Sequence, residues 1–221
     1  GGPLSAEAQE RLRFAERVLS QRTGRFILVL DGIADVTNRY GIFRSAEALG
    51  VLEVWTVLPR RVKVNKGALN AVSKRAQQWL LTRTFTSAEE CIAALRVEGR
   101  AVWVTHLHAG AKELAPPLQL PQRMALVVGS EHFGVSPEML AAADQVVYLP
   151  MVGFVESLNV GVAAALAMQR LFDMCPEARG DLPAAQRRVV MATWRKAILG
   201  RLHEGGREGG AGANATDDGA S

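Results

Sequence analysis

The chain has few cysteines and no long apolar segment. Its 221 residues include two cysteines, Cys91 and Cys175, which lie far apart and outside any CxxC pattern. Such isolated thiols favour neither a disulfide framework nor a metal site and are typical of a reducing compartment. No apolar run approaches the roughly 20 residues that a membrane-spanning helix needs. We therefore expect a protein of the cytoplasm, or of an organelle matrix, with no membrane association.

Acidic residues are absent from one long stretch. The formal net charge is +4, but residues 204–221 carry −3, which leaves +7 on the rest of the chain. Residues 54–88 contain no Asp or Glu at all. A solvated face usually mixes both signs, so a stretch of one sign favours a polyanionic partner such as nucleic acid. The basic residues of this stretch are Arg60, Arg61, Lys63, Lys66, Lys74, Arg75 and Arg83.

The middle of the chain alternates short apolar runs with helical segments. The runs are nearly continuous in Val, Ile, Leu and aromatic residues, as expected of strands that are covered on both faces. This alternation predicts an α/β fold in which a largely parallel sheet has helices on both faces. The predicted strands are 26–30, 51–57, 101–105, 124–128 and 146–149, and the predicted helices are 39–49, 67–78, 87–98, 137–143 and 157–172.

The two ends of the chain differ from this alternation. Helical spacing of apolar residues predicts one helix over 5–21 and a basic one over 184–202. After His203 the composition turns to Gly, Ala, Asp and Glu without an aliphatic anchor, which predicts disorder. The chain begins without Met, so we expect its natural N-terminus to lie elsewhere. The expected parts are a helical extension (1–24), an α/β domain (25–175), a basic helix (176–203) and a disordered tail (204–221).

The first candidate functional segment is Asn38-Arg39-Tyr40-Gly41-Ile42-Phe43-Arg44, which follows a predicted strand and Asp31. A spacing of six places Asn38 and Arg44 nearly two helical turns apart, on neighbouring faces of one helix. From the spacing alone, Asn38 is an N-capping residue and Arg44 is a surface side chain.

The second segment, Gly129-Ser130-Glu131-His132-Phe133-Gly134-Val135-Ser136, directly follows the predicted strand 124–128. Glycines at the carboxyl end of a strand permit tight turns and the close approach of a ligand, and open α/β sheets bind ligands in such crevices. The segment is neither a dinucleotide fingerprint nor a phosphate loop, because no Lys-Ser/Thr pair follows. Glu131 would suit a positively charged or hydroxyl-bearing ligand.

The third segment, residues 149–162, contains Ser157 and Asn159 at the start of a helix that is otherwise built from small and apolar residues. A buried Asn costs about 1–3 kcal/mol unless its hydrogen bonds are satisfied. Two interpretations stay open. Either Ser157 caps the helix while Asn159 bonds to the preceding loop, or both residues serve a site.

In order and spacing, residues 38–44, 129–136 and 149–163 closely resemble the three signature motifs of the SpoU family of RNA methyltransferases. Val72-Ser73-Lys74-Arg75-Ala76-Gln77-Gln78-Trp79 also resembles the segment that this family carries between its first two motifs. The resemblance spans roughly residues 25–172. The flanking helices are most similar to the branch that methylates guanosine 18 of tRNA.

The resemblance implies an S-adenosylmethionine-dependent enzyme that methylates a ribose 2′-hydroxyl in structured RNA, with tRNA favoured over rRNA. It also implies a deep C-terminal trefoil knot, a homodimer, and a bent cofactor lying in the knot. By matched position, Arg44 is the main catalytic residue, and Asn38, Glu131, Ser157 and Asn159 surround it. The residues expected to hold the cofactor are Thr105, Gly129, Leu149 and Leu158. The residues expected to hold RNA are Arg60, Arg61, Lys63, Lys74, Arg195 and Lys196.

The sequence also bears on several alternatives to this function. A guanidinium has a pKa above about 12 and is a poor base, so we favour Arg44 holding a phosphate while Glu131 or solvent takes the proton. A catalytically inactive RNA-binding member of the fold is disfavoured by the retention of the motif residues. A dinucleotide-dependent oxidoreductase lacks its Gly-rich first turn. His106 and His108 have no third ligand, so no metal is expected. Tyr40 is a departure, because family members often carry a small residue there.

Overall fold

The computed structural model describes residues 3–59 and 77–208. The chain divides into two compact units, one of residues 21–182 and one formed by residues 1–20 together with 183–221. The boundaries expected at residues 24, 175 and 203 remain predictions. The predicted helix 67–78 lies almost entirely outside the described residues.

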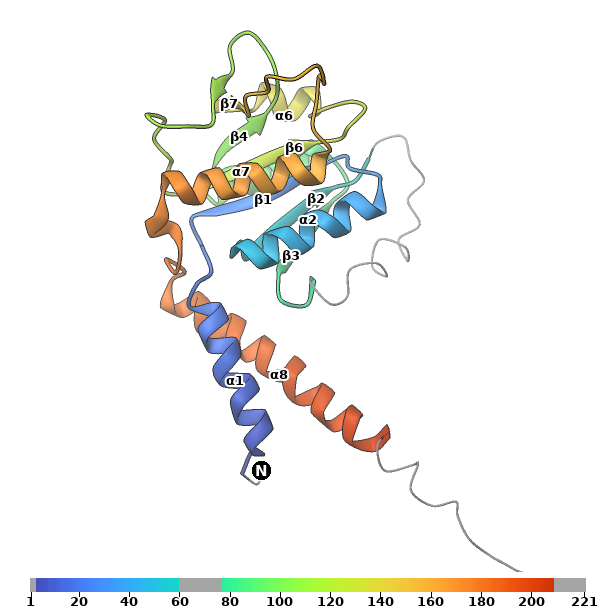
Figure 1. Ribbon diagram of the computed structural model, residues 1–221, viewed down its shortest axis with the longest axis vertical. Coiled ribbons are helices and arrows are strands. Elements are labelled where there is room, and N and C mark those ends of the chain that lie inside the picture. Colours follow the sequence, from blue (N-terminus) through green and yellow to red (C-terminus); the bar gives the residue numbers. More distant parts are fainter. Residues whose placement is uncertain (1–2, 60–76, 209–221) are drawn as a thin grey trace, which may run out of the picture. The chain divides into compact units, whose positions relative to one another are not determined.

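The larger unit contains a seven-stranded sheet in the order β3-β2-β1-β6-β4-β7-β5 (Figure 1). Every neighbouring pair of these strands is parallel, which confirms the predicted parallel α/β fold. The strands are β1 Phe26–Asp31, β2 Glu53–Val57, β3 Leu81–Phe85, β4 Ala101–Thr105, β5 Lys112–Glu113, β6 Met124–Gly129 and β7 Gln145–Tyr148.

Strands β3 and β5 were not predicted, and both lie at edges of the sheet. An edge strand has one neighbour and needs no continuous apolar run. In β3 the middle residues Thr82, Arg83 and Thr84 are exposed, and β5 is the exposed pair Lys112 and Glu113. The apolar signal that located the central strands is therefore missing from the edges.

Helices cover both faces of the sheet. On one face, α2 (Val36–Leu49) and α7 (Val160–Met174) contact each other and pack on alternate residues of β1, such as Phe26 and Leu28. On the other face, α5 (Ala88–Val97) and α6 (Pro137–Ala141) pack on the intervening residues, such as Ile27 and Val29. The short helix η1 (Pro176–Ala178) follows α7.

Two helices begin elsewhere than the sequence predicted. Asp35 caps α2 by accepting a hydrogen bond from the backbone N–H of Asn38 at 2.7 Å, so Asn38 is not the cap and lies within the first turn. Likewise Asn159, and not Ser157, caps α7. Residues 157 and 158 therefore belong to the loop before the helix. Asn38 and Ser157 therefore do not have the capping roles that the local sequence had suggested.

The smaller unit pairs α1 (Ala6–Leu19) with α8 (Ala184–Glu208). Ser5 caps α1 by accepting a hydrogen bond from the backbone N–H of Ala8 at 3.2 Å. The α8 helix extends beyond the predicted end at 202. Throughout the described ranges, no helix has the length and apolar character needed to cross a bilayer. The apolar residues buried in this unit include Ala8, Leu12, Ala15, Val190, Trp194 and Ile198.

Candidate active site

A pocket of about 230 Å³ lies at the carboxyl ends of β4, β6 and β7. This volume is somewhat smaller than the roughly 300–1,000 Å³ that is usual for small-molecule sites. The carboxyl ends of parallel strands are where open α/β sheets bind ligands. All four residues expected to hold the cofactor line this pocket: Thr105, Gly129, Leu149 and Leu158.

One wall of the pocket is the loop of residues 129–136, called here the glycine loop. It folds back on itself, because the N–H of Ser130 donates to Gly134 O at 2.9 Å and the N–H of Gly134 donates to Ser130 O at 2.8 Å. Gly134 has a φ of 65°, a left-handed conformation that favours glycine. A Cβ on Gly129 would lie 2.1–2.3 Å from the backbone of residues 134 and 135. Gly129 is therefore required by the approach of its own loop, whereas the sequence had suggested the approach of a ligand.

The opposite wall is formed from residues 150–158, called here the apolar loop. Met151, Glu156, Ser157 and Leu158 of this loop line the pocket. Within the described ranges, no hydrogen bond or ion pair joins residues 150–158 to the rest of the chain. Its other apolar side chains are exposed to solvent, and Val152 and Phe154 are fully so.

Three motif side chains form a continuous chain of hydrogen bonds beside the pocket. The amide of Asn159 donates from Nδ2 to Asn38 Oδ1 at 3.0 Å, and Asn38 Nδ2 donates to Glu131 Oε1. The direction of this chain is fixed, because Asn159 Oδ1 already accepts from the N–H groups of Gly161 and Val162 as the cap of α7. Segments far apart in sequence thus converge on the Glu131 carboxylate and hold its orientation.

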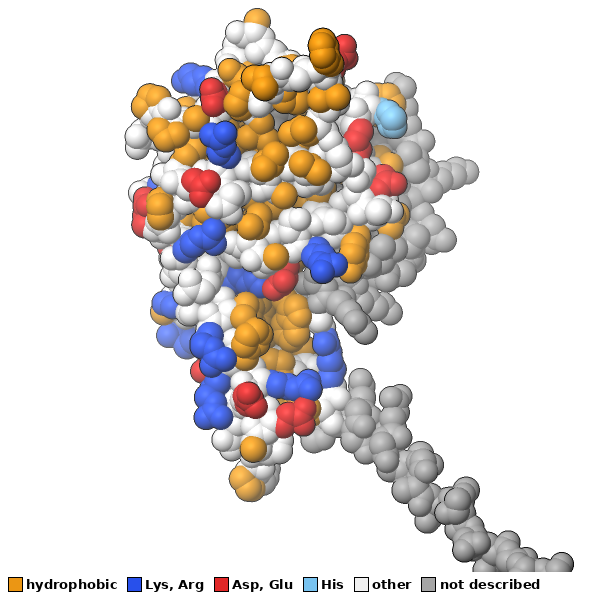
Figure 2. Space-filling model, viewed as in Figure 1, with side chains coloured by type: hydrophobic (Ala, Val, Ile, Leu, Met, Phe, Trp, Pro, Cys, Tyr) orange, Lys and Arg blue, Asp and Glu red, His pale blue; other side chains and the backbone are white. Residues whose placement is uncertain are grey.

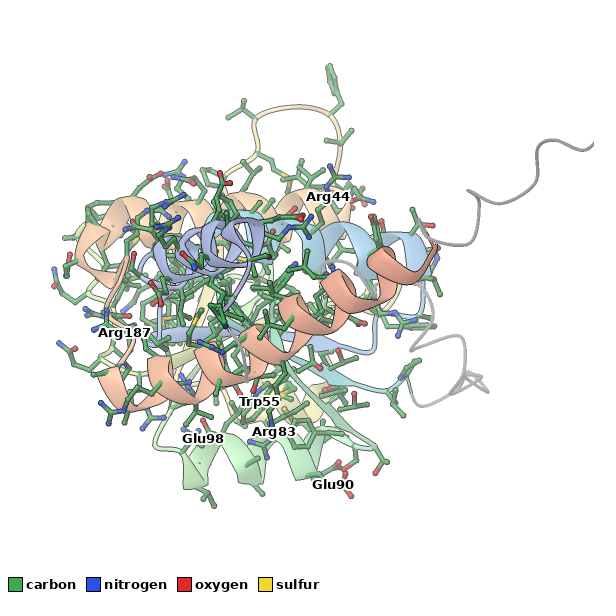
Figure 3. All side chains as sticks on the ribbon, turned by 90° about the horizontal axis from the view of Figure 1, so that it is seen from below. Arg44, Trp55, Arg83, Glu90, Glu98 and Arg187 are labelled. Carbon is green, nitrogen blue, oxygen red and sulfur yellow. The ribbon has the colours of Figure 1, made fainter. Side chains whose placement is uncertain are left out.

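The remaining predicted catalytic residue, Arg44, lies apart from this chain. It is exposed on α2 and does not line the pocket. Its side chain points away from the sheet (Figure 3). It makes no hydrogen bond or ion pair with any residue in the described ranges. Its guanidinium is therefore available to a group that arrives from solvent.

The charge of the pocket lining is negative. Its charged members are Glu131 and Glu156, and no Lys or Arg belongs to the lining among the described residues. Glu156 was not predicted as a site residue from the sequence, although it directly precedes the motif residue Ser157. The sequence feature that could have identified it is a carboxylate next to Ser157 and Asn159, two polar residues that already suggested a site.

The other predicted groups are placed as follows. Arg195 and Lys196 are exposed on α8, while Arg60, Arg61, Lys63 and Lys74 lie outside the described residues. No three His, Cys, Asp or Glu side chains gather as a metal site within the described ranges. The rings of His106 and His108 are 6.0 Å apart.

A buried thiol lies on the face of the sheet that α5 and α6 cover, in the same apolar cluster as Val135 of the glycine loop. Cys91 of α5 is fully buried, and its burial raises the pKa of the thiol to about 12, with a further contribution from the negative charge of Asp31. A thiol with this pKa stays protonated near neutral pH and is a poor nucleophile. Cys91 is therefore a structural residue.

The comparison with known proteins agrees with this geometry. Residues 25–169 match the SpoU rRNA Methylase family. The tRNA (guanosine(18)-2′-O)-methyltransferase of Thermus thermophilus is 32% identical over 165 residues, which are 75% of this chain and 83% of that protein.

Two solved structures have the same fold. The TrmH/SpoU tRNA modifying enzyme of A. aeolicus has a TM-score of 0.72 at 23% identity, over 86% of this chain and 98% of its own. The SpoU methyltransferase AviRb of Streptomyces viridochromogenes, solved in complex with the cofactor AdoMet, has a TM-score of 0.59 at 22% identity, over 71% of this chain and 62% of its own. Because the family match covers more than half of the chain and includes all three motifs, the protein belongs to the SpoU methylase family.

Proposed function

We propose that this protein transfers the methyl group of S-adenosylmethionine to a ribose 2′-hydroxyl in structured RNA. The observation that carries the proposal is the convergence of Asn38, Glu131 and Asn159 beside a pocket at the carboxyl end of the sheet, in a chain of the SpoU family.

The pocket suits a cationic cofactor. S-adenosylmethionine carries a positively charged sulfonium, and Glu131 and Glu156 give the lining a negative charge. The apolar side chains of Leu149, Leu158 and Val160 supply a surface on which the flat adenine ring of the cofactor can pack. Thr105, Gly129, Leu149 and Leu158 are the residues that would hold the cofactor, which supplies an activated methyl group.

Glu131 is the residue that we assign to the proton of the ribose hydroxyl. One carboxylate oxygen accepts from Asn38, and the other is left for the substrate. The hydrogen bond from Asn38 holds this carboxylate in one orientation, and a general base has to be positioned within hydrogen-bond reach of the proton it takes. Asn159 and Asn38 act through Glu131, and Ser157, exposed at the edge of the pocket, is assigned to the ribose.

Arg44 is assigned to the RNA backbone. Its exposed guanidinium has no partner among the described residues, and its planar shape matches a phosphate with two parallel hydrogen bonds. Fixing the neighbouring phosphate places the 2′-hydroxyl in line with the methyl donor, and such alignment is worth several kcal/mol of the barrier.

The RNA is proposed to be tRNA, with guanosine 18 favoured, and rRNA is the alternative. The relative from Thermus thermophilus is named for tRNA guanosine 18, whereas the family is described by rRNA. The exposed Arg195 and Lys196 of α8, together with Arg60, Arg61, Lys63 and Lys74, are proposed to contact phosphates.

The knot and the homodimer are also part of the proposal. After β7, near one edge of the sheet, the chain crosses to α7, which packs beside α2 over β1, and a trefoil knot would need such a crossing. A second copy would cover the apolar side chains that gather over this face (Figure 2). Val162 and Leu166 of α7 are half exposed there, in addition to the apolar loop.

Two measurements test the proposed function. Isothermal titration with S-adenosylmethionine should show binding to the purified protein. Incubation with labelled cofactor and separate tRNA and rRNA pools should label the tRNA, and alkaline hydrolysis should locate a resistant linkage at guanosine 18. Binding of RNA without methyl transfer would identify the inactive alternative, and labelling of rRNA would reassign the substrate.

A further inference from the structure

Asp31 is a buried carboxylate that none of the motifs includes. It ends β1, an interior strand of the sheet, and the residue is 4% exposed. Its Oδ2 accepts a hydrogen bond from the backbone N–H of Ser136 at 2.6 Å. A hydrogen bond from a backbone N–H to a carboxylate is generally shorter and stronger than one between two neutral groups. The contact joins two residues that are far apart in sequence.

This bond holds the far end of the glycine loop. The near end is fixed by the sheet, since Asp31 itself pairs in register with Gly129. The far end is Ser136, where α6 begins. Asp31 thus lies beside the first residue of the loop, Gly129, and also binds its last residue, Ser136. The two ends of the loop are held close together by this one residue.

We propose that Asp31 is a positioning residue that holds the glycine loop in the shape required by the cofactor pocket. Gly129, Ser130, Glu131 and Gly134 of this loop all line the pocket, and Glu131 also receives the bond from Asn38. Without its far anchor, the loop moves away from Gly129, and the pocket wall and the Glu131 carboxylate move with it. This inference rests on the proposed function, because its effect is measured on binding of S-adenosylmethionine.

A matched pair of variants separates the bond from general stability. Asp31→Ala removes the acceptor and leaves the cap of α6 intact. Ser136→Ala removes that cap, in which Ser136 Oγ accepts from the N–H of Met139, and leaves the backbone donor to Asp31 in place. Asp31→Asn is the rescue variant, because its amide oxygen can accept the same hydrogen bond.

Ser136→Pro tests the bond from the other side and replaces Asp31→Ala if that variant does not fold. It removes the donor N–H, and the φ of −61° and ψ of 150° at Ser136 are angles that proline adopts. Ser136→Ala is its control as well, because both variants lose the serine hydroxyl and differ in the backbone N–H.

The experiment measures the dissociation constant of S-adenosylmethionine by titration, the dissociation constant of unmodified tRNA, and the melting temperature of each variant. Asp31→Ala and Ser136→Pro should weaken cofactor binding about 10-fold or more, as expected when a pocket wall is displaced, and should leave tRNA binding unchanged. Asp31→Asn and Ser136→Ala should keep the wild-type cofactor affinity. Wild-type affinity in Asp31→Ala, or an equal loss in Ser136→Ala, would overturn the inference. Failure of the wild-type protein to bind the cofactor would instead refute the proposed function.

Discussion

The two loops that form the walls of the pocket are held in different ways. The glycine loop is closed by its own backbone hydrogen bonds and anchored to β1 through Asp31. The apolar loop has no hydrogen bond to the rest of the chain within the described ranges, and is held where Asn159 begins α7. Both loops place functional side chains in the same pocket. The glycine loop has a shape fixed by hydrogen bonds, whereas the apolar loop is fixed only at its C-terminal end, where α7 begins.

The difference indicates how the two walls contribute to function. Hydrogen bonds within the glycine loop fix Glu131 before any ligand arrives, which is the preorganisation that catalysis requires. The apolar loop exposes Val152 and Phe154 and can gain contacts from a ligand or a second copy. We therefore expect substitutions in the glycine loop to act through the folded chain alone and those in the apolar loop to act through its partners.

The largest effect should come from Arg44, which belongs to neither loop. Arg44→Ala should lower the rate of methyl transfer on the order of 10²-fold, the usual cost of misplacing a reacting group, because the neighbouring phosphate is no longer fixed. Cofactor affinity should stay unchanged, because Arg44 does not line the pocket. Single-turnover methylation and titration measure the two quantities. A parallel loss of cofactor affinity would place Arg44 in the cofactor site, and Arg44→Lys controls for charge without the planar fork.

The next effect contrasts one glycine from each loop. Gly129→Ala should destabilise the protein by about 1–3 kcal/mol, because the new Cβ would overlap the backbone of residues 134 and 135. Gly153→Ala in the apolar loop is the matched control, since its Cβ would meet nothing within 4 Å. Its free energy of unfolding should change by less than about 0.5 kcal/mol. Denaturant unfolding measures both, and equal values would remove the distinction between the loops.

A smaller effect on stability should come from Asn159, which joins the apolar loop to the catalytic residues. Asn159→Ala should cost about 1 kcal/mol through loss of the α7 cap. Asn159→Asp keeps an accepting oxygen for the cap but cannot donate to Asn38. Both variants should lose activity by roughly 10- to 100-fold, because the orientation of Glu131 is no longer fixed.

Thermal melting and methylation assays together separate the two roles of Asn159. The expected pattern is a lower melting temperature for the alanine variant and a wild-type melting temperature for the aspartate variant. If Asn159→Asp retained full activity, the hydrogen-bond chain to Glu131 would have no catalytic role.

The smallest effect on the isolated chain should come from Phe154. Its side chain is fully exposed, so Phe154→Ala should change the free energy of unfolding of the monomer by less than about 0.5 kcal/mol. In the proposed homodimer the same change should weaken association by about 10-fold, as for a buried aromatic anchor. Light scattering over a dilution series measures the association. An unchanged dimer would show that the apolar loop lies outside the interface.

Much of the central fold could be predicted because its signal is local. Strands β1, β4 and β6 are almost continuous apolar runs, and their helices alternate with them. Edge strand β3 could not be found this way, because its middle residues are polar and exposed. The order of the strands depends on contacts between distant segments, which no local pattern encodes.

The site could be predicted as a set of residues but not as an arrangement. The motifs identified Asn38, Glu131 and Asn159, yet spacing suggested a cap at Asn38, whereas Asp35 is the cap. The direction of the hydrogen-bond chain follows from the cap at Asn159, which requires the start of α7 to be known. Asp31 escaped notice as a contact because its partner is a backbone N–H, which has no side-chain signature in the sequence.

The position of β6 has a consequence for synthesis on the ribosome. Strand β1 pairs on one side with β2, which soon follows it, and on the other side with β6. About a hundred residues separate β1 from β6, and at roughly 5–20 residues per second the second pairing has to wait roughly 5–20 s. During that interval one edge of an apolar strand is open to other chains. The nascent protein therefore has its greatest need of a chaperone after β2 has emerged and before Gly129 leaves the exit tunnel.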